Sequence, residues 1–420
     1  MTSAPASRVD LYRAELLERI LPWWEEHAID SAGGVFTCFG NTGELVSHDK
    51  YTWSQGRWAW LCHELAVAGR QKLIRADAAA WDARSVATAR HLERTLVADG
   101  TEVAFVTDRD GTHLPDDDGA VSLSVYADLF AALGFVGASS SANDPDRLRW
   151  SAAAHRLLAA ADRSVRDGSA PSAPYPVPAG FVDLGRTMLL LNVATEVNRH
   201  TGSEQSRDIV EAAVDRVVGP DGQWDAARCW EFRPSDPAGG LADTLLANHI
   251  NPGHILELAW MLLDAAHVSD TTRSLLPDWL PVTVLRTLEL GWDAQHGGIL
   301  RFVDRHGGAP TGRRLGDSAY EDLVVDTWDT KLWWVHIEAL LACEMFAVST
   351  GDPAFDAWSD RLADYILTTF PDPAGGEWLQ IRDRAGAPLD RVVALPVKDP
   401  FHVPRALIRM IRLHEGTPAS

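Results

Sequence analysis

Two histidines in this chain lie where helices are expected to begin. The first belongs to the segment Asn251-Pro-Gly-His254-Ile-Leu-Glu257, in which an asparagine N-cap followed by proline is typical of a helix start. His254 would then lie in the first turn, with Glu257 one turn later on the same face. The helix end lowers the pKa of such a histidine and the carboxylate raises it, which leaves an imidazole able to act as a base near pH 7. The alternative is a surface His–Glu pair, or a core histidine that its neighbour satisfies.

The second histidine, His402, has a proline on each side. In Asp399-Pro-Phe-His402-Val-Pro404-Arg405 the prolines place the imidazole at a helix entrance, since proline fixes the backbone there and restricts the residue before it. Arg405 follows on the same predicted helix. The alternative is that His402 caps this last helix and that Arg405 pairs with any nearby carboxylate.

A cluster of aromatic and polar residues follows Lys50. Tyr51, Trp53, Gln55 and Arg57 stand close together. They combine flat apolar rings, an amide that both donates and accepts, and a fixed fork of donors. This combination suits the hydroxyls and ring oxygen of a sugar. A second aromatic cluster, which begins at Trp328, allows the same interpretation, and for both clusters the alternative is packing between helices.

Glycine pairs mark a repeated unit in the chain. The pairs at 33–34, 297–298 and 375–376 each precede a short strand-like run that leads to a polar turn, and 102–111 repeats the run without the glycines. The last unit contains Glu377 and Trp378, which are further candidates for substrate contact. Repetition over this length favours one domain, residues 1–420.

Helical periodicity dominates the sequence between these units. It predicts helices over 8–28, 56–70, 76–98, 123–137, 148–166, 186–201, 206–217, 252–267, 279–290, 331–350, 353–369 and 403–414. Helices that alternate with short strand-turn units predict an all-α fold, a single (α/α)6 barrel with short β-hairpins in the inter-helix loops. The irregular stretches 167–184, 225–250, 304–328 and 385–400 would gather around one mouth of this barrel and form a pocket there.

Composition excludes several classes of function. A net charge of −21 and a pI near 5.0 argue against nucleic acid and anionic membranes as partners. The four cysteines form no Cys-x-x-Cys pair, and no apolar run suggests a signal peptide or a membrane span. The expected location is therefore the cytoplasm. Nucleotide-binding, serine-nucleophile and His-Glu-x-x-His motifs are absent, so we expect no cofactor and no metal. Seventeen tryptophans against six tyrosines are compatible with sugar binding.

The chain resembles the N-acylglucosamine 2-epimerase superfamily, which also contains cellobiose 2-epimerases and mannose-type aldose–ketose isomerases. The resemblance is carried in order by Gly-Gly-Val-Phe (33–36), Lys50, Trp-Ser-Gln-Gly-Arg (53–57), Tyr-Ala-Asp-Leu-Phe (126–130), Asn-Pro-Gly-His-Ile-Leu-Glu (251–257), Lys-Leu-Trp-Trp-Val-His-Ile-Glu (331–338), Gly-Glu-Trp (376–378) and Phe-His-Val-Pro-Arg (401–405). It covers the whole chain and implies the (α/α)6 barrel that the helix pattern also predicts.

The resemblance also implies roles for individual residues. His254 and His402 would be the paired general acid and base, Glu257 the partner of His254, and Arg57 the residue that holds the sugar near its carbonyl. The implied reaction is proton transfer at C2 of an unphosphorylated hexose or N-acylhexosamine through an enediolate. The expected partner is thus a small sugar, and a homodimer is left open.

Three alternatives to 2-epimerisation remain: an isomerase, a glycoside hydrolase, and a binding or scaffold protein without catalytic activity. A mannose-type aldose–ketose isomerase would use the same site, but such enzymes and cellobiose epimerases carry a further histidine on the helix that here reads Gly185-Arg-Thr-Met-Leu-Leu-Leu-Asn192. The absence of that histidine moves the resemblance toward N-acylglucosamine epimerases. A glycoside hydrolase on the same barrel would instead need two carboxylates, such as Asp326, Asp329 or Glu377.

Overall fold

The computed structural model describes residues 7–417 except 98, 117–118, 237–238, 317 and 392–396. Helices predominate, and the described strands pair only two at a time. Among the described helices, none combines the length and apolar composition needed to cross a lipid bilayer.

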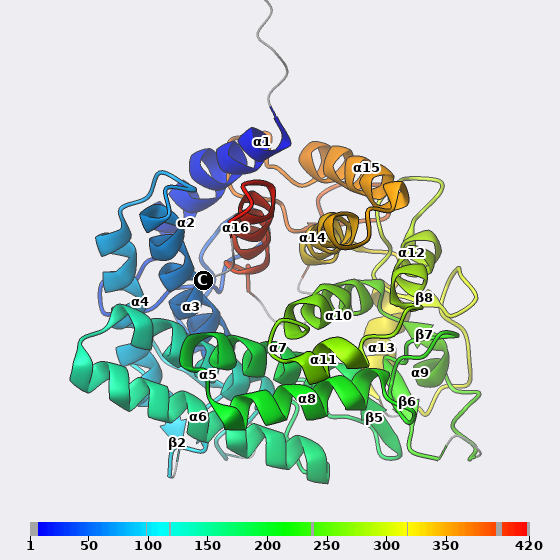
Figure 1. The fold of residues 1–420 in the computed structure, drawn as a ribbon, viewed down its shortest axis with the longest axis horizontal. Coiled ribbons are helices and arrows are strands. Elements are labelled where there is room, and N and C mark those ends of the chain that lie inside the picture. Colours follow the sequence, from blue (N-terminus) through cyan, green and yellow to red (C-terminus); the bar gives the residue numbers. More distant parts are fainter. Residues whose placement is uncertain are drawn as a thin grey trace, which may run out of the picture.

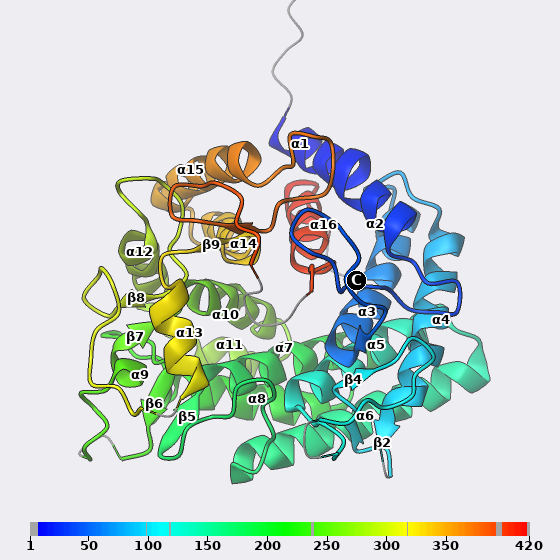
Figure 2. The same ribbon diagram turned by 180° about the vertical axis from the view of Figure 1, so that it is seen from behind.

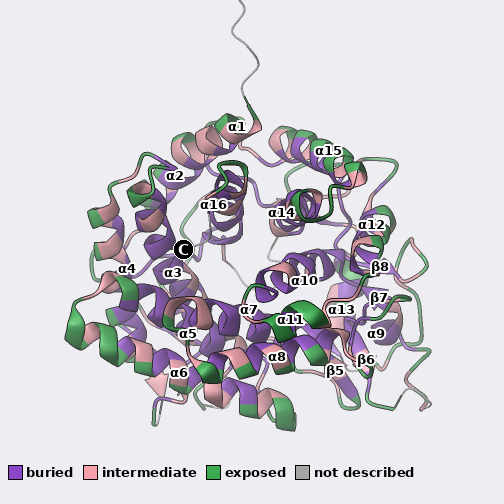
Figure 3. Cartoon of the chain, viewed as in Figure 1, coloured by how far each residue is buried: buried purple, intermediate pink, exposed green. Residues whose placement is uncertain are grey.

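An inner set of helices packs into a closed ring (Figure 1). Each member contacts the next, and the last contacts the first, in the order α3 (Thr52–Arg70), α5 (Val125–Ser141), α7 (Leu184–Thr201), α10 (Pro252–Ala265), α14 (Trp333–Thr350) and α16 (His402–His414). These helices are buried on most of their faces (Figure 3). The sequence of α5, which is apolar almost all round, is typical of such a position.

Outer helices surround this ring and bury one stripe each. They are α1 (Arg8–Ala14), π-helix η1 (Glu15–Ile20), α2 (Leu21–His27), α4 (Ala78–Thr95), α6 (Asp144–Asp167), α8 (Glu204–Val218), α12 (Leu280–Gly291) and α15 (Pro353–Thr369). Side-chain caps at Asp77, Ser203 and Asp352 begin three of them. All twelve helices predicted from periodicity are present, the first divided into α1, η1 and α2.

Three short helices were not predicted. They are α9 (Leu245–Asn248), α11 (Asp270–Leu275) and α13 (Ala319–Thr327). Two of them, α9 and α13, lie in stretches that the sequence marked as irregular. Seen from behind, α13 lies across the face where the connections gather (Figure 2).

Short strand pairs connect the loops at one end of the ring. The pairs are β1 (Lys50–Tyr51) with β4 (Val106–Thr107), β5 (Phe181–Asp183) with β6 (Phe232–Pro234), β7 (His249–Ile250) with β8 (Val303–Asp304), and β9 (Lys331–Leu332) with β10 (Ile381–Arg382). In each pair the first strand directly precedes an inner helix, and the second follows the next outer helix. Successive connections are therefore tied together where inner helices begin.

This pairing differs from the predicted hairpins. Of the named strand pairs, only β2 (Leu96–Val97) with β3 (Glu102–Val103) joins consecutive strands within one connection. The turns of the repeated units close through single bridges, such as Thr107 with His113 and Arg382 with Pro388. The ring brings neighbouring loops alongside each other, and a strand of two or three residues then pairs with the adjacent loop.

Close contact between α3 and α5 fixes the position of Arg57. A Cβ atom on Gly56 would lie 2.0 Å from the Phe130 carbonyl oxygen, so only glycine allows the two backbones to approach this far. We expect Gly56→Ala to lower the free energy of unfolding by about 1–3 kcal/mol, because the helices must separate. Urea denaturation measures this. Gly240→Ala is the control, since no atom lies within 4 Å of its added Cβ, and equal stability of both variants would contradict the prediction.

Candidate active site

A cavity of about 310 Å³ opens where the inner helices begin. Because these helices all start at the same end of the ring, their first turns bring side chains from distant parts of the sequence together. Six of the predicted site residues line this cavity: Trp53 and Arg57 from α3, His254 and Glu257 from α10, and His402 and Arg405 from α16.

His402 is held by a carboxylate from the neighbouring helix α14. Its Nδ1 lies 2.8 Å from Glu338 Oε1, and the side chain is 9% exposed. The Glu338 Oε2 atom accepts from Trp260 Nε1 at 2.8 Å. A carboxylate at Nδ1 fixes the proton on that nitrogen and so leaves the lone pair of the neutral ring on Nε2.

Arg405 lies between two buried carboxylates, those of Glu257 and Glu338. Its Nη2 donates to Glu257 Oε1 at 2.8 Å and to Glu338 Oε1 at 2.6 Å. Burial would raise the pKa of Glu338, but the charges of Arg405 and His402 outweigh burial and hold this pKa well below its usual range. Glu257, Glu338 and His402 are close enough together to ligate a metal. In this arrangement, however, the guanidinium already supplies the positive charge between them.

His254 is held by Glu231, not by Glu257. Its Nδ1 lies 2.8 Å from Glu231 Oε1, which also accepts from the Tyr320 hydroxyl at 3.3 Å. The prediction that Glu257 bonds His254 is therefore wrong, because Glu257 turns toward Arg405 and acts on His254 only through its charge. Burial alone would lower the pKa of His254, yet the Glu231 carboxylate raises it above the ordinary value.

Trp334 lies close to both imidazoles. Its ring centroid is 5.4 Å from that of His254 and 5.8 Å from that of His402. Within the described residues, Nε2 of neither histidine has a hydrogen-bond partner. The cavity wall thus presents two imidazoles, each fixed through Nδ1 by its own carboxylate, and each can exchange a proton through Nε2.

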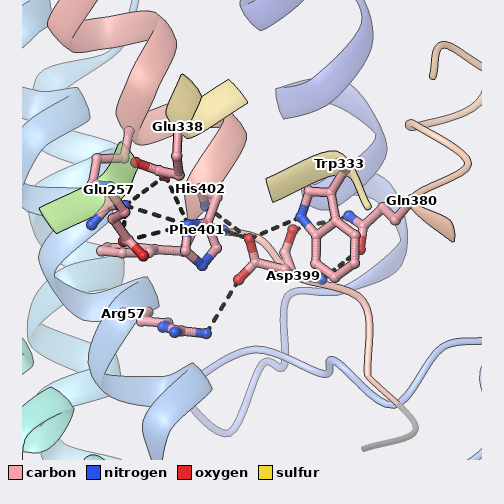
Figure 4. A network of polar contacts seen from close by, with 9 residues as sticks. Arg57, Glu257, Trp333, Glu338, Gln380, Asp399, Phe401 and His402 are labelled. Carbon is pink, nitrogen blue, oxygen red and sulfur yellow. Dashed lines mark hydrogen bonds and ion pairs between the residues drawn. The ribbon is translucent and has the colours of Figure 1, made fainter. Parts of the chain in front are cut away.

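Arg57 is positioned beside the entrance of α16. Its Nη1 lies 3.5 Å from Asp399 Oδ1, and its guanidinium lies 4.0 Å from the centre of the Phe130 ring. The other Asp399 oxygen, Oδ2, accepts from the backbone N–H groups of Phe401 and His402, at 3.2 and 2.8 Å. Asp399 therefore links Arg57 to the start of the helix that carries His402 (Figure 4).

Five predicted site residues do not line the cavity. Gln55 is fully buried and exchanges hydrogen bonds with the backbone of Val35, at 2.9 and 2.7 Å. Glu377 pairs with Lys398 at 2.7 Å, and burial raises its pKa. The others pack in or beside the core: Trp378 on Phe370, Tyr51 on Phe105, and Trp328 under Arg384. In these positions all five support the fold around the site.

Several residues of the site were not predicted from the sequence. Glu231, Glu338 and Trp334 hold or flank the two histidines, and Arg301 adds a further cation to the cavity wall. A signal was present for two of them, because Trp334 and Glu338 belong to the aromatic cluster around 328–338. Glu231 lies in a stretch without periodicity, and no motif marked it.

The chain is similar to known proteins over nearly its whole length. The family profile described as N-acylglucosamine 2-epimerase (GlcNAc 2-epimerase) matches residues 34–406. The N-acylglucosamine 2-epimerase of Mus musculus is 29% identical over 404 residues, which are 93% of this chain and 88% of that protein.

Two solved structures share the fold. The cellobiose 2-epimerase from Bacillus thermoamylovorans B4167 superposes with a TM-score of 0.73 at 18% identity, over 96% of this chain and 98% of its own. A D-mannose isomerase gives a TM-score of 0.73 at 17% identity, over 98% and 99% of the two chains.

Proposed function

Because the chain belongs to the N-acylglucosamine 2-epimerase family, we propose that it is a sugar 2-epimerase acting at C2 of an unphosphorylated hexose or N-acylhexosamine. The observation that carries this proposal is the pair of imidazoles in one cavity, each fixed at Nδ1 by a separate carboxylate. The closed inner ring with its outer helices fits the (α/α)6 barrel of this proposal.

The proposed mechanism moves one proton at a time. The sugar ring opens to the aldehyde, and the Nε2 atom of one imidazole removes the weakly acidic C2 proton. Negative charge then develops on O1, where Arg57 stabilises the enediolate. The other imidazole returns a proton to the opposite face of C2, which gives the epimer. The raised pKa of His254 increases its protonated fraction at neutral pH and so suits it to donate.

Aldose–ketose isomerisation on the same site is the alternative outcome of this mechanism. Delivery of the proton to C1 in place of C2 gives the ketose. Hydrolysis fits the site less well, because Asp326, Asp329 and Glu377 do not line the cavity. The carboxylates that do line it are engaged: Asp183 with Arg186 and Tyr126, Glu231 with His254, Glu257 with Arg405, and Asp399 with Arg57.

Incubation with candidate sugars in deuterated water tests the proposed function. We expect deuterium at C2 together with a new epimer or ketose, because the proton leaves C2 in either reaction. Mass spectrometry and NMR of glucose, mannose, their N-acetylated 2-amino forms and cellobiose measure both. If no sugar in such a panel gains deuterium or a new isomer, the proposal is wrong.

A further inference from the structure

Arg301 is a buried cation in the wall of the cavity. Arg301 follows the glycine pair at 297–298 in the sequence. The residue lines the cavity and is 6% exposed. Its Nη1 donates to the Thr327 hydroxyl at 3.0 Å, whereas its Nε is buried without a hydrogen-bond partner. Nη2 has no hydrogen bond to any described residue either. The guanidinium therefore keeps two donor groups that the described protein does not use.

The other cations of the cavity all have carboxylate partners. Arg57 faces Asp399 at 3.5 Å, Arg405 faces Glu257 at 2.8 Å, and Lys398 faces Glu377 at 2.7 Å. Arg301 forms no ion pair with a carboxylate of the described residues. Removing a charge from water is costly unless an opposite charge compensates for it. Arg301 is thus the cation of this wall that lacks a counter-charge.

Burial and a neighbouring positive charge both disfavour the charged form of Arg301. Burial lowers the pKa of Arg301 to about 10, Tyr320 and Tyr175 oppose this effect, and the nearby positive charge of Arg391 adds to it. At neutral pH the guanidinium is still charged. Since the whole chain carries a net charge of −21, a buried arginine without a facing carboxylate is not a consequence of a basic composition. Its charge creates a local positive potential in the cavity wall of an acidic protein.

We propose that the sugar bound in this cavity is acidic, and that Arg301 pairs with its anionic group. This inference rests on the proposed function and adds the class of substrate to it. A guanidinium matches the two oxygens of a carboxylate or phosphate with parallel hydrogen bonds. The Arg301 guanidinium lies 4.9 Å from the centre of the Phe302 ring, which packs on Tyr320, and Tyr320 donates to the carboxylate that holds His254. The anionic group is therefore placed on the His254 side of the cavity. A hexuronic acid, with its carboxylate at C6, has the required chemistry.

Matched sugars test this inference on the unmodified enzyme. Glucose and mannose are compared with glucuronate and mannuronate, and glucose 6-phosphate distinguishes a phosphate from a carboxylate. C2 deuterium exchange gives kcat/KM for each. We expect the preferred acid to exceed its neutral counterpart by about 10- to 150-fold, the range of a charge-assisted hydrogen bond. Equal or better turnover of the neutral sugars would overturn the inference.

Substitution of Arg301 tests whether this residue causes the preference for the acidic sugar. Arg301→Met should lower kcat/KM for the acidic sugar by about 10- to 150-fold more than for the neutral sugar, whereas Arg301→Lys should keep part of the preference. Arg305→Gln is the control, because Arg305 lies in the same repeated unit but does not line the cavity. A preference that survives in Arg301→Met would assign the anion site elsewhere. If that variant does not fold, the comparison of sugars on the unmodified enzyme still decides.

The two proposals fail in different ways. Deuterium exchange with a neutral sugar but no gain from an acidic group would reject the anionic substrate and keep the epimerase. The absence of exchange with every sugar, neutral or acidic, would reject the proposed function itself.

Discussion

Replacing His402 with asparagine is expected to lower kcat by about 10²–10⁴-fold, the contribution of a positioned acid or base. Asparagine keeps a polar group near Glu338 Oε1, which bonds His402 Nδ1 at 2.8 Å, but it cannot exchange a proton at neutral pH. His254→Asn should have an effect of the same size, because epimerisation needs a proton removed from one face of C2 and returned to the other. Steady-state rates in both directions measure the loss.

Isotope exchange separates the two histidines further. In His402→Asn, the epimer whose C2 proton faces His254 should still exchange that proton with deuterated water, although it cannot invert. The other epimer should not exchange. His254→Asn should show the opposite asymmetry. His267→Asn, at an exposed position in the turn after α10, is the control and should behave as the unmodified enzyme. Near-normal inversion in either site variant would remove that residue from the acid–base pair.

The sequence located both histidines because their signals are local. Asn251 before Pro252 marks a helix start, and two prolines flank His402, so His254 could be placed in a first helical turn and His402 at a helix entrance without tertiary information. The helices were predictable for a related reason, since their periodicity or uniform apolarity reflects the face that each buries.

The partners of the histidines could not be found in this way. Glu231 is 23 residues from His254, and Glu338 is 64 residues from His402. The closed ring, not the spacing along the chain, brings them together. Glu257 was chosen because residues three apart on a helix share a face. The same face of α10 also faces α16, and there Arg405 donates to the Glu257 carboxylate.

The sequence of a motif does not show which of its polar residues contact the substrate and which support the fold. Gln55 and Arg57 are two positions apart on α3 and so point in different directions. Arg57 reaches the cavity, whereas Gln55 satisfies the backbone of Val35. The two residues were predicted to bind a sugar together. In the structure, only Arg57 lies on the side of α3 that faces the cavity, whereas Gln55 lies on a side that supports the fold. The same holds for the last repeat, where Glu377 and Trp378 support the segment that leads to His402.

Glu338 has the largest expected effect on stability. We expect Glu338→Gln to lower the free energy of unfolding at pH 7 by about 3–5 kcal/mol, because it removes one of two carboxylates from the buried Arg405 and the hydrogen-bonded charge from His402. Urea denaturation measures this, with the exposed Glu289→Gln as the control. A loss no larger than that of the control would contradict the prediction.

The pH dependence of this difference follows from the lowered pKa of Glu338. A carboxyl group whose folded pKa lies below its unfolded pKa contributes stability above the unfolded pKa and loses it as pH falls through the folded pKa. The difference in free energy of unfolding between the unmodified protein and Glu338→Gln should therefore begin to shrink below about pH 4.3. The triple variant Glu257→Gln/Glu338→Leu/Arg405→Met should recover much of the stability, since it removes the buried guanidinium together with both of its carboxylate partners and buried ion pairs can often be replaced without loss. It should not recover turnover, because His402 would lack the carboxylate that fixes its proton on Nδ1. Stability and catalysis would then be separated within this one buried cluster.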